Sequence, residues 1–185
     1  MSKFKIITAI ILLISISTTA QITKGNWMVG GTASFTSSSY ESTTNNNNTS
    51  SGKGIGIILS PTFGYFIIDK LALGISPTFG YTKTDGGNDS TSYGIGPFIR
   101  YYLLKPEKRI NVLTNVSYYY GTNNANTTTN NLNFKAGPVI FLNSSVALEL
   151  TLNYNIGQSK SESSISTYKS FNFGLGFQIH LEKNR

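Results

Sequence analysis

The chain has 185 residues, of which 15 are Lys or Arg and 8 are Asp or Glu, giving a net charge of +7. Only 12% of the residues are charged, roughly half the share in an ordinary soluble domain. The sequence has no cysteine and one histidine, His180. These counts exclude disulfides, a cysteine nucleophile, a lipoprotein anchor, and metal sites built from thiolates or several histidines.

The first twenty residues are typical of a secretory signal peptide. Two lysines precede an apolar run over residues 6–16, and small polar residues follow up to Ala20. The run is too short to span a membrane. We therefore predict a signal peptide over residues 1–20, cleavage after Ala20, and a single domain over residues 21–185. The modest positive charge that remains is spread along the chain, so nucleic-acid binding is not expected.

Alternation with a period of two dominates the rest of the chain, and helical spacing is convincing nowhere. From Ile55 to Tyr65 every second residue is apolar, and small or polar residues stand between them. Such segments are β-strands with two unlike faces. The pattern predicts eight strands, at residues 26–36, 53–66, 71–83, 92–102, 110–121, 132–142, 146–156 and 170–181.

The connections between these strands alternate in kind. Polar, asparagine-rich tracts such as residues 37–52 and 122–131 alternate with tight turns such as residues 68–70 and 143–145. An up-and-down meander places every second connection at the same end. We therefore expect four long surface loops at one end of the sheet and short turns at the other.

The two faces of the predicted strands differ in polarity. One face is apolar and uncharged, and the other consists of Gly, Ser, Thr and Asn with Arg100, Lys135 and Glu149. A lipocalin-like soluble barrel would need many Lys and Glu outside, which this chain lacks. An uncharged outer belt with a polar interior is typical of a membrane barrel. The sequence thus predicts an all-β fold, an eight-stranded antiparallel up-and-down transmembrane β-barrel.

Three stretches resemble a known family: SPTFGYFIIDKLALGISPTFGY, GIGPFIRYY and VIFLNSSVALEL. They are similar to the bacterial outer-membrane β-barrel domain family common in Bacteroidota, of the kind that includes OmpX and the OmpA membrane domain. The resemblance covers nearly all of the chain after residue 20. It implies a place in the bacterial outer membrane, among outer-membrane lipid and lipopolysaccharide.

The last predicted strand resembles the assembly signal of such barrels, with Asn172, Gly174, Phe177 and Ile179 at the matching positions. This resemblance implies that the barrel assembly machinery is a partner during insertion. The chain departs from the signal because residues 182–185 follow the strand, whereas the signal ends on an aromatic residue.

An eight-stranded barrel has an interior just wide enough for side chains to fill. Arg100 and Glu149 stand at similar distances from the short-turn end, so we predict that they pair across the lumen. Further polar residues are expected to complete a luminal network, and these are Lys135, Asn115, Asn133 and Tyr119. A structural role is favoured over an ion path, because buried ion pairs mostly fix an arrangement.

Catalysis and cofactors are not expected. His180 is placed on the polar face at the end of the last strand, as a wet luminal or rim residue, with no Asp or Glu in its strand to orient it. The tripeptide Asp89-Ser90-Thr91 resembles the O-glycosylation signal of Bacteroidota surface proteins, which makes Ser90 a candidate modification site.

The hexapeptide SPTFGY occurs at residues 60–65 and again at 76–81. Matched alternation allows a hairpin in which Pro61 lies opposite Pro77. A proline removes a ladder bond, and a closed barrel has no edge strand to accommodate that loss. We therefore predict a bulge or a missing hydrogen bond at each of four prolines, Pro61, Pro77, Pro97 and Pro138.

The favoured function is that of a small monomeric outer-membrane barrel with a structural or surface-interaction role, in envelope integrity, adhesion or loop-mediated binding to an extracellular partner. Its filled lumen would not make it a general porin. Two alternatives remain open: a minor ion or small-solute channel in the outer membrane, and a soluble periplasmic lipocalin-like lipid carrier.

Overall fold

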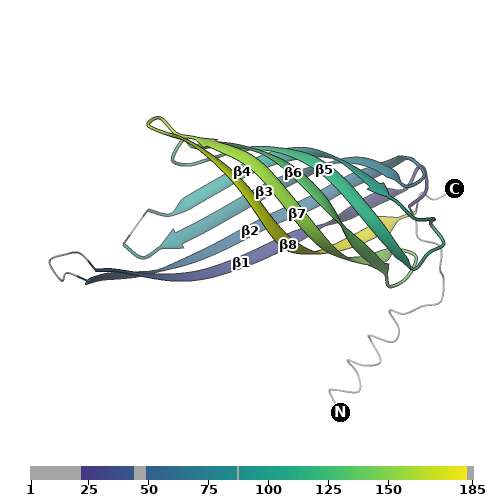
Figure 1. The fold of residues 1–185 in the computed structure, drawn as a ribbon, viewed down its shortest axis with the longest axis horizontal. Helices are drawn as coiled ribbons and strands as arrows, with labels where there is room; N and C mark the ends of the chain where they lie inside the picture. Colours follow the sequence, from purple (N-terminus) through teal and green to yellow (C-terminus); the bar gives the residue numbers. More distant parts are fainter. Residues whose placement is uncertain (1–21, 44–48, 87, 183–185) are drawn as a thin grey trace, which may run out of the picture.

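The structure is a computed structural model that describes residues 22–43, 49–86 and 88–182. The predicted signal peptide and the cleavage after Ala20 lie outside these residues. Long strands wind around a common axis (Figure 1), and the chain order contains eight of them. They are β1 (Trp27–Thr43), β2 (Thr49–Ile68), β3 (Leu71–Thr84), β4 (Ser90–Tyr102), β5 (Ile110–Asn123), β6 (Thr128–Phe141), β7 (Val146–Lys160) and β8 (Ile165–Leu181).

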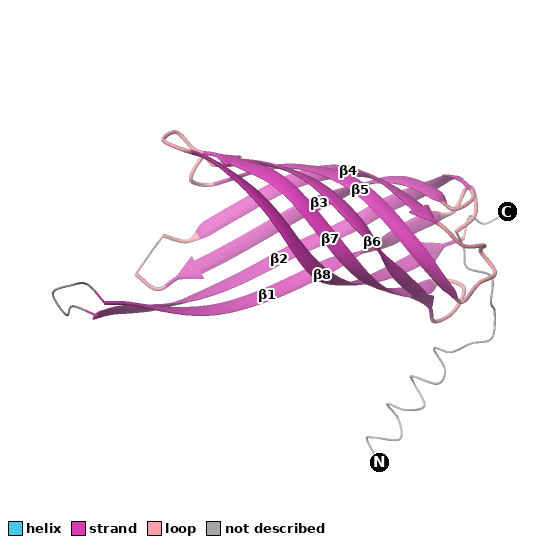
Figure 2. Cartoon of the chain, viewed as in Figure 1, coloured by secondary structure: helices cyan, strands magenta, loops and turns pink. Residues whose placement is uncertain are grey.

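The strands form one closed antiparallel barrel in chain order, β1 to β8. Figure 2 shows strands joined by turns throughout the described chain. No helix among the described residues is long and apolar enough to cross a membrane. The predicted eight-stranded up-and-down barrel is confirmed.

The barrel has two different ends (Figure 1). The turn end carries the connections at residues 69–70, 103–109 and 142–145, together with the first described residue, Ile22. The tip end carries the other four hairpins, including residues 124–127 and 161–164.

The predicted long loops at the tip end are for the most part strand. β1 continues to Thr43 instead of ending at residue 36, β6 begins at Thr128 instead of 132, and β8 begins at Ile165 instead of 170. These Ser-, Thr- and Asn-rich tracts have no apolar alternation, so hydrophobic periodicity does not reveal them. Their backbones nevertheless pair residue by residue with the neighbouring strand.

The outer face of the barrel is an apolar belt. Large side chains such as Leu150, Ile99 and Phe79 are half exposed there. Outward-facing charged side chains of the described strands all lie toward the tip end, and they are Glu41, Lys53, Lys83, Lys160 and Lys169. The belt between them and the turn end is therefore free of charge, as a lipid environment requires.

The ladder is interrupted on one side at each of the four strand prolines. Pro61 and Pro77 lie opposite each other, and the register between β2 and β3 stops before them and resumes after them. The same interruption occurs at Pro97 between β4 and β5 and at Pro138 between β6 and β7. The register resumes without an extra residue, so these are missing ladder bonds and not bulges.

Candidate functional site

An apolar plug closes the lumen at the turn end. His180 lies at its centre, with its ring centroid 5.8 Å from Phe66, 6.1 Å from Tyr102 and 5.5 Å from Phe141. Each of these side chains is 4% exposed or less. The plug is completed by Ile22, Met28, Leu113 and Val139.

The predicted wet His180 is wrong, and at this end the predicted polar interior is replaced by a mainly apolar one. His180 is fully buried, and of its two ring nitrogens only Nε2 has a hydrogen-bond partner, the Tyr102 hydroxyl at 3.4 Å. The runs that end these strands, such as residues 65–68 and 139–141, are apolar on both faces. That loss of alternation is the signal that could have revealed the plug.

The segment before β1 covers the plug at the turn end. Ile22 is fully buried, and its carbonyl accepts a hydrogen bond from the Lys70 amide at 2.8 Å. The Gly25 amide donates to the Phe66 carbonyl at 2.9 Å. These residues carry no strand pattern, so nothing in the sequence predicts their role.

An ion pair spans the lumen directly above the plug. Arg100 Nη1 donates to Glu149 Oε1 at 2.6 Å, and both side chains are 3% exposed. Arg100 Nε also donates to Asn115 Oδ1 at 3.3 Å. Nη1 additionally lies 3.5 Å from Met28 Sδ, a plug residue. The structure thus brings together three residues of the predicted luminal network and joins them to the plug.

Lys135 lies beside this pair on the luminal face. The register sets Lys135 between Asn115 on β5 and Asn153 on β7, and the charges of Arg100 and Glu149 act on it. Among the described residues no acidic side chain lies within ion-pair distance of Lys135. The charged side chains on the luminal face of the described strands are two basic ones, Arg100 and Lys135, and one acidic one, Glu149.

Asparagine side chains continue the polar lining toward the tip end. Asn155 Oδ1 accepts hydrogen bonds from Asn133 Nδ2 at 2.8 Å and Asn131 Nδ2 at 3.2 Å. Its Nδ2 donates to Ser170 Oγ at 3.3 Å. Asn133, predicted for the luminal network with Lys135, makes its hydrogen bond within this amide ladder, which leads across β7 to β8.

Tyr119, also predicted for the network, lies apart from the ion pair. Its ring covers Gly94 and Gly121, where a Cβ would collide with it. Tyr168 of β8 covers Gly157 in the same manner. Two tyrosines thus use the space that glycines leave open on the luminal face.

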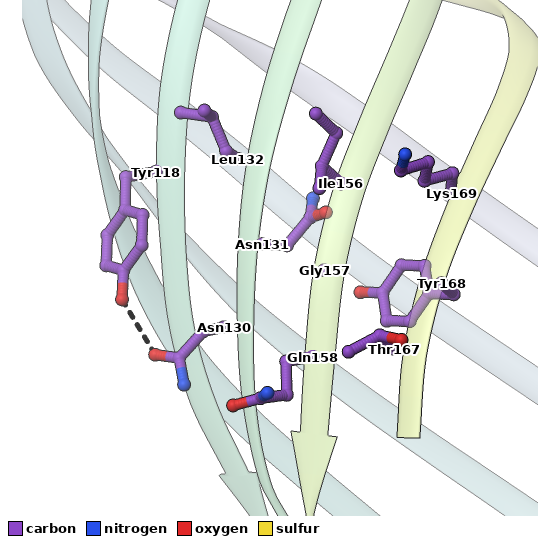
Figure 3. A pocket seen from close by; sticks show the side chains of 10 residues that line it. All are labelled: Tyr118, Asn130, Asn131, Leu132, Ile156, Gly157, Gln158, Thr167, Tyr168 and Lys169. Carbon is purple, nitrogen blue, oxygen red and sulfur yellow. Dashed lines mark hydrogen bonds between the residues drawn. The ribbon is translucent and has the colours of Figure 1, made fainter. Parts of the chain in front are cut away.

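A groove of ≈700 Å³ lies over β5 to β8 toward the tip end (Figure 3). Figure 3 shows the Tyr118 hydroxyl donating to Asn130 Oδ1, at 2.7 Å. Leu132 and Ile156 form its apolar part, whereas Lys169 lies at the β8 side. The groove therefore marks the boundary between the apolar belt and the polar tips.

The two remaining predicted sites can be placed on the fold. Ser90 is the first residue of β4, half-buried at the tip end opposite Thr82. In the predicted assembly signal on β8, Asn172 and Gly174 face the lumen of the barrel, whereas Phe177 and Ile179 are exposed on its outer face. Ile179 pairs with Val29 at the closure between β8 and β1.

The closure between β1 and β8 is short. The two strands pair over five residues, from Trp27↔Leu181 to Gly31↔Phe177. Beyond this point, residues 32–43 of β1 and 165–176 of β8 pair only with their other neighbours, β2 and β7. Figure 1 shows the two strands diverging toward the tip end. We call this stretch the open seam.

A profile of the family described as "Protein of unknown function, DUF481" matches residues 10–179. The chain belongs to the DUF481 family. None of the curated proteins searched matches this DUF481 chain. The described residues contain no group of three His, Cys, Asp or Glu side chains that could hold a metal ion.

Among solved structures, the DUF481 chain is similar to the outer membrane protein OprG from Pseudomonas aeruginosa, with 14% identity and a TM-score of 0.52. The similarity covers 89% of this chain and 100% of the OprG chain. At this identity it shows the fold alone: the DUF481 chain has the fold of an outer-membrane β-barrel.

Proposed function

We propose that this DUF481 protein is a small outer-membrane barrel with a structural or surface-interaction role, and that it is not a general porin. The observation that carries the proposal is the apolar plug beneath the Arg100–Glu149 pair. A plug that carries no charge and offers no continuous row of polar groups opposes the passage of hydrated solutes. The apolar belt anchors the barrel in lipid.

The belt also supports an outer-membrane location over a soluble carrier. A soluble lipocalin-like barrel keeps its large apolar side chains inside, whereas here Leu152, Phe134 and Ile99 are exposed outside. Aromatic side chains at the turn end, such as the Trp27 and Tyr65 rings with centroids 5.0 Å apart, are suited to a membrane–water interface.

We further propose a Bacteroidota-type, OmpX-like surface protein exported through its signal peptide, surrounded by outer-membrane lipid and lipopolysaccharide. β8 would be the strand read by the barrel assembly machinery. The four polar hairpins at the tip end would face the outside and present backbone and amide groups to an extracellular partner. We propose a monomer without enzymatic activity or nucleic-acid partner.

Location is tested by fractionating cells that express the full chain. We expect the mature protein in the outer-membrane fraction, released only by detergent, and a shift in gel migration between unheated and boiled samples because a closed barrel resists unfolding. Release from the periplasm without detergent would favour the soluble carrier and contradict the proposal.

The closed lumen is tested with purified protein in planar bilayers. We expect no stable conductance, because the plug leaves no continuous water path. A charge-selective conductance that is abolished by Glu149→Gln would instead support the minor channel.

A further inference from the structure

The open seam breaks the wall of the barrel within the apolar belt. Phe173 and Leu175, on the outer face of β8 beside the seam, are 78% and 74% exposed. In β1, Phe35 is 68% exposed. Because apolar side chains lie on both sides, the part of the seam nearer the turn end lies at the depth of lipid chains.

Strand edges are costly at this depth. Unpaired backbone N–H and C=O groups have no water to bond in hydrocarbon, and each costs several kcal/mol. The seam must therefore either zip shut or receive a polar group. Zipping is geometrically available: continuing the register of the five existing pairs sets Ala33 opposite Leu175 and Phe35 opposite Phe173. Both pairs would face lipid with matched apolar side chains.

Polar luminal groups reach this seam from the inside. The register connects Lys135 to Asn153 and Asn153 to Asn172, which lies on the seam edge of β8. Neighbouring strands are about 4.8 Å apart, so Lys135 stands about 10 Å from that edge. A Cβ at Gly174 would lie 2.8 Å from Asn153 Nδ2, and one at Gly176 would lie 3.1 Å from Glu149 Oε2. At these two positions β8 has no side chain between Asn153 or Glu149 and the seam.

The charge of this polar row favours an anion. Glu149 is neutralised by Arg100 at 2.6 Å, and among the described residues Lys135 has no acidic partner. Amide groups of Asn153 and Asn172 line the way to it. A headgroup with one negative charge could reach Lys135 while an attached chain stays between Phe35 and Phe173 in the membrane.

We propose that the open seam is a lateral port through which a single-chain anionic amphiphile of the surrounding membrane binds, with its headgroup beside Lys135, its polar linkage at the edges of β1 and β8, and its chain outside them between Phe35 and Phe173. The seam zips when the site is empty. The inference rests on the membrane location proposed above.

The experiment measures binding of lysophosphatidylglycerol to the purified barrel by native mass spectrometry, with lysophosphatidylcholine as the probe without net charge. Since the chain has no cysteine, the variant Ala33→Cys/Leu175→Cys can be joined across the seam, directly or with a short bis-thiol linker. The control Val29→Cys/Ile179→Cys joins a pair that the structure already sets opposite each other.

We expect joining Ala33→Cys to Leu175→Cys to weaken lysophosphatidylglycerol binding at least tenfold, with recovery on reduction or linker cleavage, and no change in the joined control. Lys135→Gln should weaken binding about tenfold and abolish the preference over lysophosphatidylcholine. Lys169→Gln, an exposed lysine on the outer face of β8, should have no effect.

Equal binding by the joined and unjoined seam variants would overturn the port, as would equal effects of Lys135→Gln and Lys169→Gln, because the lipid would then be held on the outer surface. Tight binding of a short water-soluble carboxylate such as butyrate would also overturn it, since no membrane chain would be needed. Gel migration before and after boiling separates the two proposals: a barrel that folds and inserts without binding contradicts the port alone.

Discussion

At the scale of single residues, the main polar feature of the lumen is the buried ion pair between Arg100 and Glu149. Both side chains are 3% exposed and meet at 2.6 Å. A buried pair contributes little when compared with apolar residues of the same volume, but removing one partner leaves the other charge uncompensated. The pair therefore fixes how β4 and β7 face each other more than it adds stability.

Glu149→Gln should lower the free energy of unfolding by about 3 kcal/mol, because the Arg100 guanidinium is left without its counter-charge. Urea unfolding of the barrel in lipid vesicles measures this change. The double variant Arg100→Met/Glu149→Leu should be more stable than Glu149→Gln, and Glu107→Gln, an exposed turn residue, should stay within about 0.5 kcal/mol of the wild type. A loss below about 1 kcal/mol for Glu149→Gln would mean that the pair is solvated.

At the scale of strands, the repeated hexapeptide SPTFGY is a hairpin that faces itself. Pro61 and Pro77 lie opposite each other, and the ladder between β2 and β3 is interrupted there without a bulge. The physical cause is the missing N–H of each proline. The two copies run in opposite directions and fill the same belt positions, so they do not form a tandem binding motif.

Pro61→Val should supply the missing donor, and the new amide should bond the Pro77 carbonyl across the hairpin. We expect it to be protected in hydrogen exchange, with overall stability changed by less than about 1 kcal/mol, because the gain of one bond is offset by a more flexible unfolded chain. Pro106→Val, in the turn after β4, is the control, and its amide should exchange fast. Fast exchange at residue 61 would show that the strands are held apart by something other than the proline ring.

At the scale of the whole molecule, the barrel is closed at the turn end and open along part of its side. The apolar plug blocks the axis, and the open seam faces the membrane. A solute that follows the axis meets aromatic rings, whereas a molecule in the lipid meets a gap lined by glycine and asparagine. The architecture thus favours exchange with the membrane over passage through it.

Tyr102→Ala/His180→Ala should remove two rings from the plug and produce conductance in planar bilayers where the wild type has none. The matched control is Phe134→Ala/Tyr154→Ala, which removes two rings from the outer face. Both variants are first checked for gel migration before and after boiling, so that unfolded protein is not measured. A silent Tyr102→Ala/His180→Ala barrel that still folds would show that Arg100, Glu149 and their neighbours seal the lumen without the plug.

The strand number, the up-and-down order, the apolar belt and the approximate depth of Arg100 and Glu149 can all be predicted from the sequence. Each follows from alternation with a period of two and from the cost of charge in lipid, which act locally along the chain. The same dependence on local patterns explains why the predicted strand bounds are wrong at the tip end. The Ser-, Thr- and Asn-rich strands there pair through their backbones and have no apolar alternation.

The plug, the contacts of Lys135 and the open seam depend on how the whole chain folds. The surroundings of His180 are apolar because Phe66, Tyr102 and Phe141 pack around it from three other strands. The seam is open because β1 and β8, the first and last strands of the sheet, share only five residue pairs. Closure brings together residues about 150 positions apart, and its extent depends on the tilt and register of all eight strands, a property that no single stretch of sequence encodes.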